Sequence, residues 1–86
     1  PPPQTDQDLR DYLKGTQWKM SGNKVLTFQK SGEVHKSWGK LRPKWKVEEM
    51  RVIYEGKVFE FSEDFTEIRL ISGRNDAGKL GLLVKR

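Results

Sequence analysis

The residues with the clearest chemical potential lie in one stretch, Lys36–Val47, which mixes tryptophans with cations and contains no acid. The stretch holds two indoles and five cations: Trp38, Trp45, Lys36, Lys40, Arg42, Lys44 and Lys46. Ammonium and guanidinium groups bind phosphates or carboxylates, and an indole can stack on a base or a sugar. The pattern therefore predicts a surface for an anionic partner. The opposing interpretation is that the tryptophans fill a core while the lysines form the solvated face of a strand.

Positive charge is concentrated in the same half of the chain. The segment 14–46 holds nine Lys or Arg residues and a single acid, Glu33, a balance of +8, although the whole chain carries only +5. Lys19, Lys24 and Lys30 widen this positive region on its N-terminal side. Such a field attracts nucleic acid, an anionic membrane surface or an acidic protein segment.

The residue types needed for catalysis or metal binding do not form a set. His35 is the only histidine and cysteine is absent, which excludes a histidine cluster, a thiolate metal site and a Cys-His nucleophile. Neighbouring acids such as Glu48 and Glu49 point to opposite faces of a strand and cannot act together. We therefore expect no enzymatic activity, no metal and no cofactor.

One glycine-containing segment, Gly73–Lys79, has the spacing of a phosphate-binding loop, because four residues separate its glycines and a lysine follows the second. Leu80 stands where that motif requires Ser or Thr, and a strand, not a helix, is expected to follow. We interpret the segment as a hairpin loop. A minor hypothesis is that Arg74 and Lys79 extend the basic surface.

The elements that position these residues begin with a short helix. Thr5 or Asp6 can cap a helix that runs through about Leu13, and Gly15 is placed to end it. From residue 16 onward apolar residues recur at every second position, which is typical of strands, and tight turns separate the runs. The prediction is a mainly β fold: a small antiparallel β-meander or barrel of about seven or eight short strands with one short N-terminal helix.

Alternation also sorts the three tryptophans. Trp18 and Trp45 share faces with the apolar residues two positions further on, so both are expected in the core. Trp38 differs. If Val34 points into the core, alternation places Lys36 and Trp38 on the same inward face, and an unpaired buried lysine is unfavourable. We expect the strand to bend near Lys36, or that face to be solvated, and Trp38 to be the accessible indole.

Length and composition allow one domain. Residues 1–4 are interpreted as a proline-rich linker and residues 5–86 as a single small β-barrel-like domain. The chain starts on Pro1, without an initiator methionine, and we expect it to be excised from a longer protein. No run approaches the roughly 20 apolar residues of a membrane span. The absence of cysteine favours the cytoplasm or the nucleus.

Three functional hypotheses follow. The first is a non-catalytic binding module whose basic, tryptophan-containing face holds nucleic acid, single-stranded above all, or another polyanion; Trp38 would stack and the cations would meet phosphates. The second is a protein-interaction or regulatory accessory domain that docks an acidic segment or contacts the catalytic domain of its own parent chain. The third and weakest is a carbohydrate-binding appendage with Trp38 as its platform.

Overall fold

The computed structural model describes residues 2–73 and 78–85, and it has one α-helix, one short 3-10 turn and eight strands. Their bounds are α1 Asp6–Leu13, β1 Thr16–Lys19, η1 Ser21–Asn23, β2 Val25–Phe28, β3 Val34–Lys36, β4 Lys46–Glu48, β5 Arg51–Tyr54, β6 Lys57–Phe61, β7 Glu67–Ser72 and β8 Leu80–Lys85. The predicted mainly β, antiparallel fold with one N-terminal helix is confirmed. Of the predicted loop, Arg74 and its three successors lie outside the described residues.

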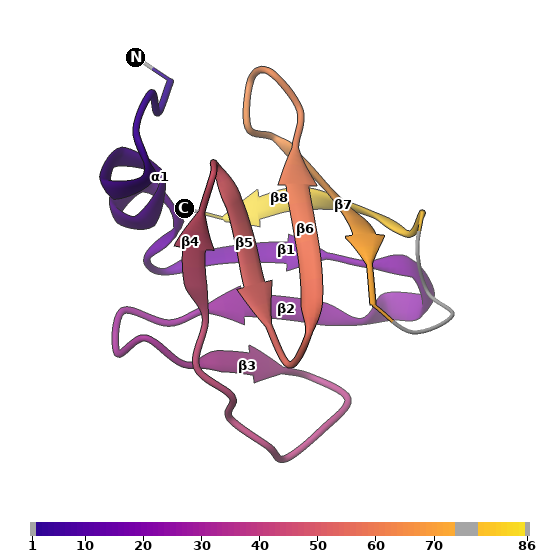
Figure 1. The fold of residues 1–86 in the computed structure, drawn as a ribbon. Helices are drawn as coiled ribbons and strands as arrows, with labels where there is room; N and C mark the ends of the chain where they lie inside the picture. Colours follow the sequence, from indigo (N-terminus) through magenta and orange to yellow (C-terminus); the bar gives the residue numbers. More distant parts are fainter. Residues whose placement is uncertain (1, 74–77, 86) are drawn as a thin grey trace.

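The eight strands form one curled sheet in the order β3-β2-β1-β8-β7-β6-β5-β4, with every pair antiparallel. Consecutive strands pair except β3 and β4, and β1 pairs with β8, which joins the first three strands and the last five in one curled sheet whose edge strands are β3 and β4. A single bridge between Glu33 and Lys44 spans the remaining gap. The four strands β3, β2, β1 and β8 cross behind β4, β5 and β6 at a steep angle (Figure 1).

The core lies between these two layers and follows the period of two in the sequence. Its buried apolar members are Leu9, Leu13, Trp18, Leu26, Phe28, Val34, Trp45, Val47, Val52, Tyr54, Phe59, Ile68 and Leu70. The predicted burial of Trp18 and Trp45 is confirmed. The Trp18 indole nitrogen donates to Thr16 Oγ1 at 2.9 Å, and that hydroxyl donates to the carbonyl of Leu13 at 2.6 Å. The buried polar atoms of this layer are therefore satisfied where the helix meets β1.

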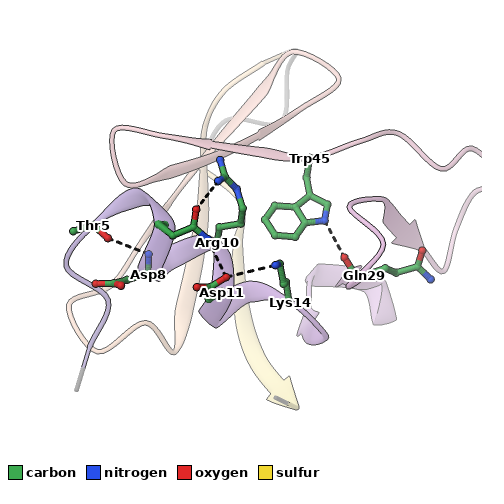
Figure 2. Close-up of polar contacts among 8 residues, drawn as sticks. Thr5, Asp8, Arg10, Asp11, Lys14, Gln29 and Trp45 are labelled. Atoms are coloured by element: carbon green, nitrogen blue, oxygen red, sulfur yellow. Dashed lines mark hydrogen bonds and ion pairs between the residues drawn. The ribbon is translucent and has the colours of Figure 1, made fainter.

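The helix α1 packs against β4 and covers one end of the barrel. Thr5 is its N-cap, because the Asp8 amide donates to Thr5 Oγ1 at 3.1 Å. Leu9 and Leu13 are fully buried one turn apart, and Gly15 then turns the chain into β1 with a φ of 83°. Figure 2 shows the capping bond together with the Asp11–Lys14 ion pair on the outer side of the helix.

Because the strands alternate in direction, the connections sort into two groups. The β1–β2, β3–β4, β5–β6 and β7–β8 connections begin at one end of the barrel, which we call the mouth. The β2–β3, β4–β5 and β6–β7 connections lie at the opposite end together with α1, which we call the helix end.

Candidate functional site

The mouth contains a small hollow of about 70 Å³ that is lined by aromatic, aliphatic and cationic side chains. Its lining residues are Met20, Ser21, Lys24, Leu26, Trp38, Tyr54, Lys57, Phe59, Leu70 and Lys79. They come from four strands and three connections, so the hollow forms only when the sheet is curled. Three lysines and no acid appear among them. The mouth therefore combines an apolar floor with a positive rim.

Trp38 stands on this rim with 41% of its surface exposed. Strand β3 ends at Lys36, and the next residue, Ser37, hydrogen-bonds the Val25 backbone twice, through its amide at 3.0 Å and its hydroxyl at 2.9 Å. This double anchor fixes the turn that carries Trp38. The Lys24 ammonium lies 5.5 Å from the centroid of the indole, within cation–π range.

A second cation–aromatic pair also lines the hollow. Tyr54 stacks on Phe59 with centroids 5.4 Å apart and an interplanar angle of 9°, and the Lys57 ammonium lies 5.4 Å from the Tyr54 ring centroid. Burial, and after it the negative charge of Glu55, raises the pKa of Tyr54 to about 12. The phenol therefore stays neutral at physiological pH. It forms a rigid apolar wall beside Lys57.

The structure shows how Lys36 can be buried on the inward face of its strand. It points inward like Val34, with 9% exposure, and its ammonium lies 2.8 Å from Glu55 Oε1. Burial of this lysine is tolerated because the carboxylate compensates its charge. The pair also ties the end of β3 to the β5–β6 turn. Lys36 is thus directed at Glu55, so we assign it a structural role and give it no phosphate contact.

The other predicted cations do not line the hollow. Arg42 Nη1 lies 3.5 Å from Gln29 Oε1, the Lys44 backbone pairs with Glu33, and Lys46 forms an exposed ion pair with Glu48 at 3.1 Å. Next to Lys44, Trp45 is buried and donates its indole N–H to the Gln29 carbonyl at 3.3 Å (Figure 2).

The last three predicted cations also differ in location. Lys30 approaches Gly15 at the helix end, and Lys19 is exposed on the outer surface of β1. Lys40 is exposed in the loop between β3 and β4. Of the nine predicted site residues, only Lys24 and Trp38 line the hollow.

Two lining lysines, Lys57 and Lys79, were missed as main site residues because they lie outside the basic half of the sequence. The signal that finds them is topological. In an up-and-down meander every second connection reaches the same end, so the β5–β6 and β7–β8 connections join the one that carries Lys24. Local charge density could not reveal this, since the three lysines are far apart in sequence.

The described residues offer little else that points to chemistry. Within residues 2–73 and 78–85, no group of three or more His, Cys, Asp or Glu side chains could hold a metal ion. None of the helices in that part of the chain has the length and apolarity to cross a membrane. Comparisons with protein-family models, curated proteins and solved structures returned no match. Function is therefore inferred from the geometry of the mouth.

Proposed function

We propose that this domain is a non-catalytic binding module that holds single-stranded nucleic acid across the mouth of its barrel. The observation that carries the proposal is the exposed Trp38 indole, which lies beside the Lys24 ammonium on a hollow shared with Lys57 and Lys79. Trp38 stacks on a base, and the three lysines meet the phosphates that flank it. This assignment keeps the predicted stacking residue and replaces most of the predicted phosphate contacts.

The size of the hollow favours an open surface over an enclosed ligand site. Pockets for drug-sized molecules measure roughly 300–1,000 Å³, whereas the mouth holds about 70 Å³. A whole nucleotide is not enclosed there. A flexible strand that lays one base on Trp38 and passes its backbone over the lysines needs no deeper cavity. Recognition by stacking and charge is tolerant of sequence, because every base has a π face.

The proposal is tested by titrating a fluorescent single-stranded oligonucleotide at about 50 mM and about 200 mM salt. Three phosphate contacts give a log–log salt slope of about −2, or about a 20-fold loss of affinity over this range. An affinity that barely changes with salt contradicts the proposal. An acidic peptide and a neutral oligosaccharide, titrated in parallel, test the accessory-domain and carbohydrate hypotheses.

Matched variants locate the site. Trp38→Ala should weaken binding by at least about fivefold through loss of base stacking, whereas Trp38→Phe keeps a ring and should recover part of the affinity. Lys24→Ala should flatten the salt slope by about 0.7. Lys46→Ala removes another exposed cation, outside the hollow, and should leave the slope unchanged. Equal losses in the Lys24 and Lys46 variants would show that the mouth is not the site.

A further inference from the structure

The outer face of β8 carries a row of aliphatic side chains that nothing in the described structure covers. Leu80, Leu82 and Val84 are 55%, 58% and 57% exposed at alternate positions of one strand. The solvated face of an antiparallel sheet is normally polar at such positions. Single exposed apolar residues are common on protein surfaces. Three that are contiguous on one strand indicate an interaction surface.

The charges beside this row are arranged with opposite signs on its two flanks. Leu82 pairs across the sheet with Lys19 on β1 and with Glu67 on β7, and both of these side chains are exposed. Leu80 pairs with Arg69, whose charge is matched by an ion pair with Glu60 on β6. One flank of the row is therefore positive at Lys19, and the other is negative at Glu67.

We propose that this face binds a second copy of the chain, with a two-fold axis running parallel to β8. Such an axis exchanges the two flanks, so that Lys19 of each copy faces Glu67 of the other, and the aliphatic rows meet between them. An in-plane axis running across the strands would place Lys19 opposite Lys19 and Glu67 opposite Glu67. The charge pattern thus favours one arrangement of an isologous pair over the other.

The surface has room for the side chains of a facing sheet to interdigitate. A shallow hollow of about 400 Å³ lies beside Leu80 and Leu82, with Lys19 and Glu67 in its lining. Two sheets packed face to face lie about 10 Å apart with their inner side chains interleaved. Three aliphatic residues and their flanks fall short of the roughly 800 Å² per partner of a standard stable interface. The pair is therefore weak and forms at high protein concentration.

The arrangement has a consequence that rests on the proposed function. Strand β8 runs from the mouth to the helix end. A two-fold axis parallel to it makes both copies point the same way, and the two mouths open toward the same side. One nucleic-acid strand could then engage both sites, which raises the apparent affinity without any new contact.

Association is tested with the isolated chain and no ligand, so its outcome is independent of nucleic-acid binding. Sedimentation velocity from about 10 μM to about 1 mM should show the apparent mass rise from 10.1 kDa toward twice that value. Leu82→Glu should remain monomeric over the whole range, and circular dichroism should show that this outward substitution leaves the fold intact. A chain that stays monomeric at about 1 mM overturns the proposal.

A charge swap tests the direction of the axis. Lys19→Glu or Glu67→Lys alone places like charges opposite each other twice, and each should weaken association by at least about tenfold. The double variant restores both pairs and should recover the association of the parent chain. If the double variant is as weak as the single ones, the two flanks do not face each other and the proposed axis is wrong.

Discussion

The two ends of the barrel differ in how their apolar interior is covered. At the mouth the apolar interior reaches the surface, and its rim carries Lys24, Lys57 and Lys79. At the helix end α1 covers the interior with two fully buried leucines, Leu9 and Leu13. One end is closed by packing and the other is left open beside an exposed indole. The comparison predicts that substitutions at the helix end affect mainly stability, whereas the exposed residues of the mouth tolerate substitution better.

Polar contacts reinforce the closure of the helix end. The Asp6 carboxylate accepts hydrogen bonds from the Glu49 and Met50 amides at 3.1 and 2.8 Å. Both of those residues have positive φ, 52° and 61°, which is unfavourable for side chains other than glycine. The helix thus holds the β4–β5 turn in a conformation that its own residues do not favour. Nearby, Tyr12 donates its hydroxyl to the Phe65 carbonyl at 2.8 Å.

The largest effect is expected where the helix fills the core. Leu13→Ala removes a fully buried side chain and should lower the free energy of unfolding by about 2–5 kcal/mol. The same substitution at Leu41, which is 69% exposed in the β3–β4 loop, is the matched control and should change stability by less than about 0.5 kcal/mol. Urea denaturation measures both. Equal losses would show that α1 is not the stabilising cover described above.

Loss of the helix–turn contact should have an intermediate effect. Asp6→Ala deprives two backbone amides of a charged acceptor and should cost about 1–3 kcal/mol in thermal or urea unfolding. Asp11→Ala, on the exposed side of the same helix, removes a surface ion pair with Lys14 at 3.5 Å and an exposed hydrogen bond from Gln7 at 3.0 Å, and it serves as control. A larger loss in the Asp11 variant would contradict the assigned role of Asp6.

At the mouth, removal of the acid and removal of the base of the Lys36–Glu55 ion pair should lower the free energy of unfolding by different amounts. Glu55→Gln leaves the charge of the buried Lys36 uncompensated and should cost about 1–2 kcal/mol, a range lowered because Glu55 is partly exposed. Lys36→Met removes the buried charge itself and should cost less. Both variants should keep the helix end intact, which amide exchange of α1 checks. The reverse order of stabilities would mean that Lys36 does not depend on Glu55.

The smallest effect concerns alkaline pH. The folded-state pKa of Tyr54 is about 12, above its ordinary value of 10.0, so the buried phenol stabilises the fold fully below pH 10 and this contribution is lost as pH rises through about 12. At about pH 11 the loss should be about 1 kcal/mol. Tyr54→Phe should lose less stability over this pH range. Tyrosinate absorbance in a Tyr12→Phe background reports Tyr54 alone, and titration near pH 10 would contradict its burial.

The strands of the fold were predictable because hydrophobic periodicity marks them in the sequence. Alternation located the strands and correctly placed Trp18 and Trp45 in the core. The expectation that the strand bends at Lys36 or that its face is solvated was wrong: Lys36 is buried in line with the alternation from Val34, because Glu55, 19 residues away in a different hairpin, compensates its charge. Local pattern does not reveal which side chain compensates a buried charge. That depends on how the sheet curls.

The site was less predictable for the same reason. A run of cations in sequence is distributed over several faces once its residues occupy strands and turns, so Lys46 and Lys24 end on different surfaces. Lys57 and Lys79 join Lys24 because alternate connections share one end of the barrel. Charge density along a chain therefore does not show which cations come together in the fold. The up-and-down order of the strands shows which connections, and so which lysines, share one end of the barrel.

The pairing of β1 with β8 also bears on how the molecule folds. The other strand ladders join consecutive strands and need only short segments to meet, whereas the β1–β8 ladder brings Gln17 against Lys85 across almost the whole chain. Loop-closure entropy opposes that encounter until the intervening hairpins have shortened the effective distance. We expect the β1–β8 ladder to form last. A chain truncated before β8 should lose the link between the β1–β3 and β4–β7 parts of the sheet and become prone to aggregation, because β1 and β7 then become additional unpaired edges.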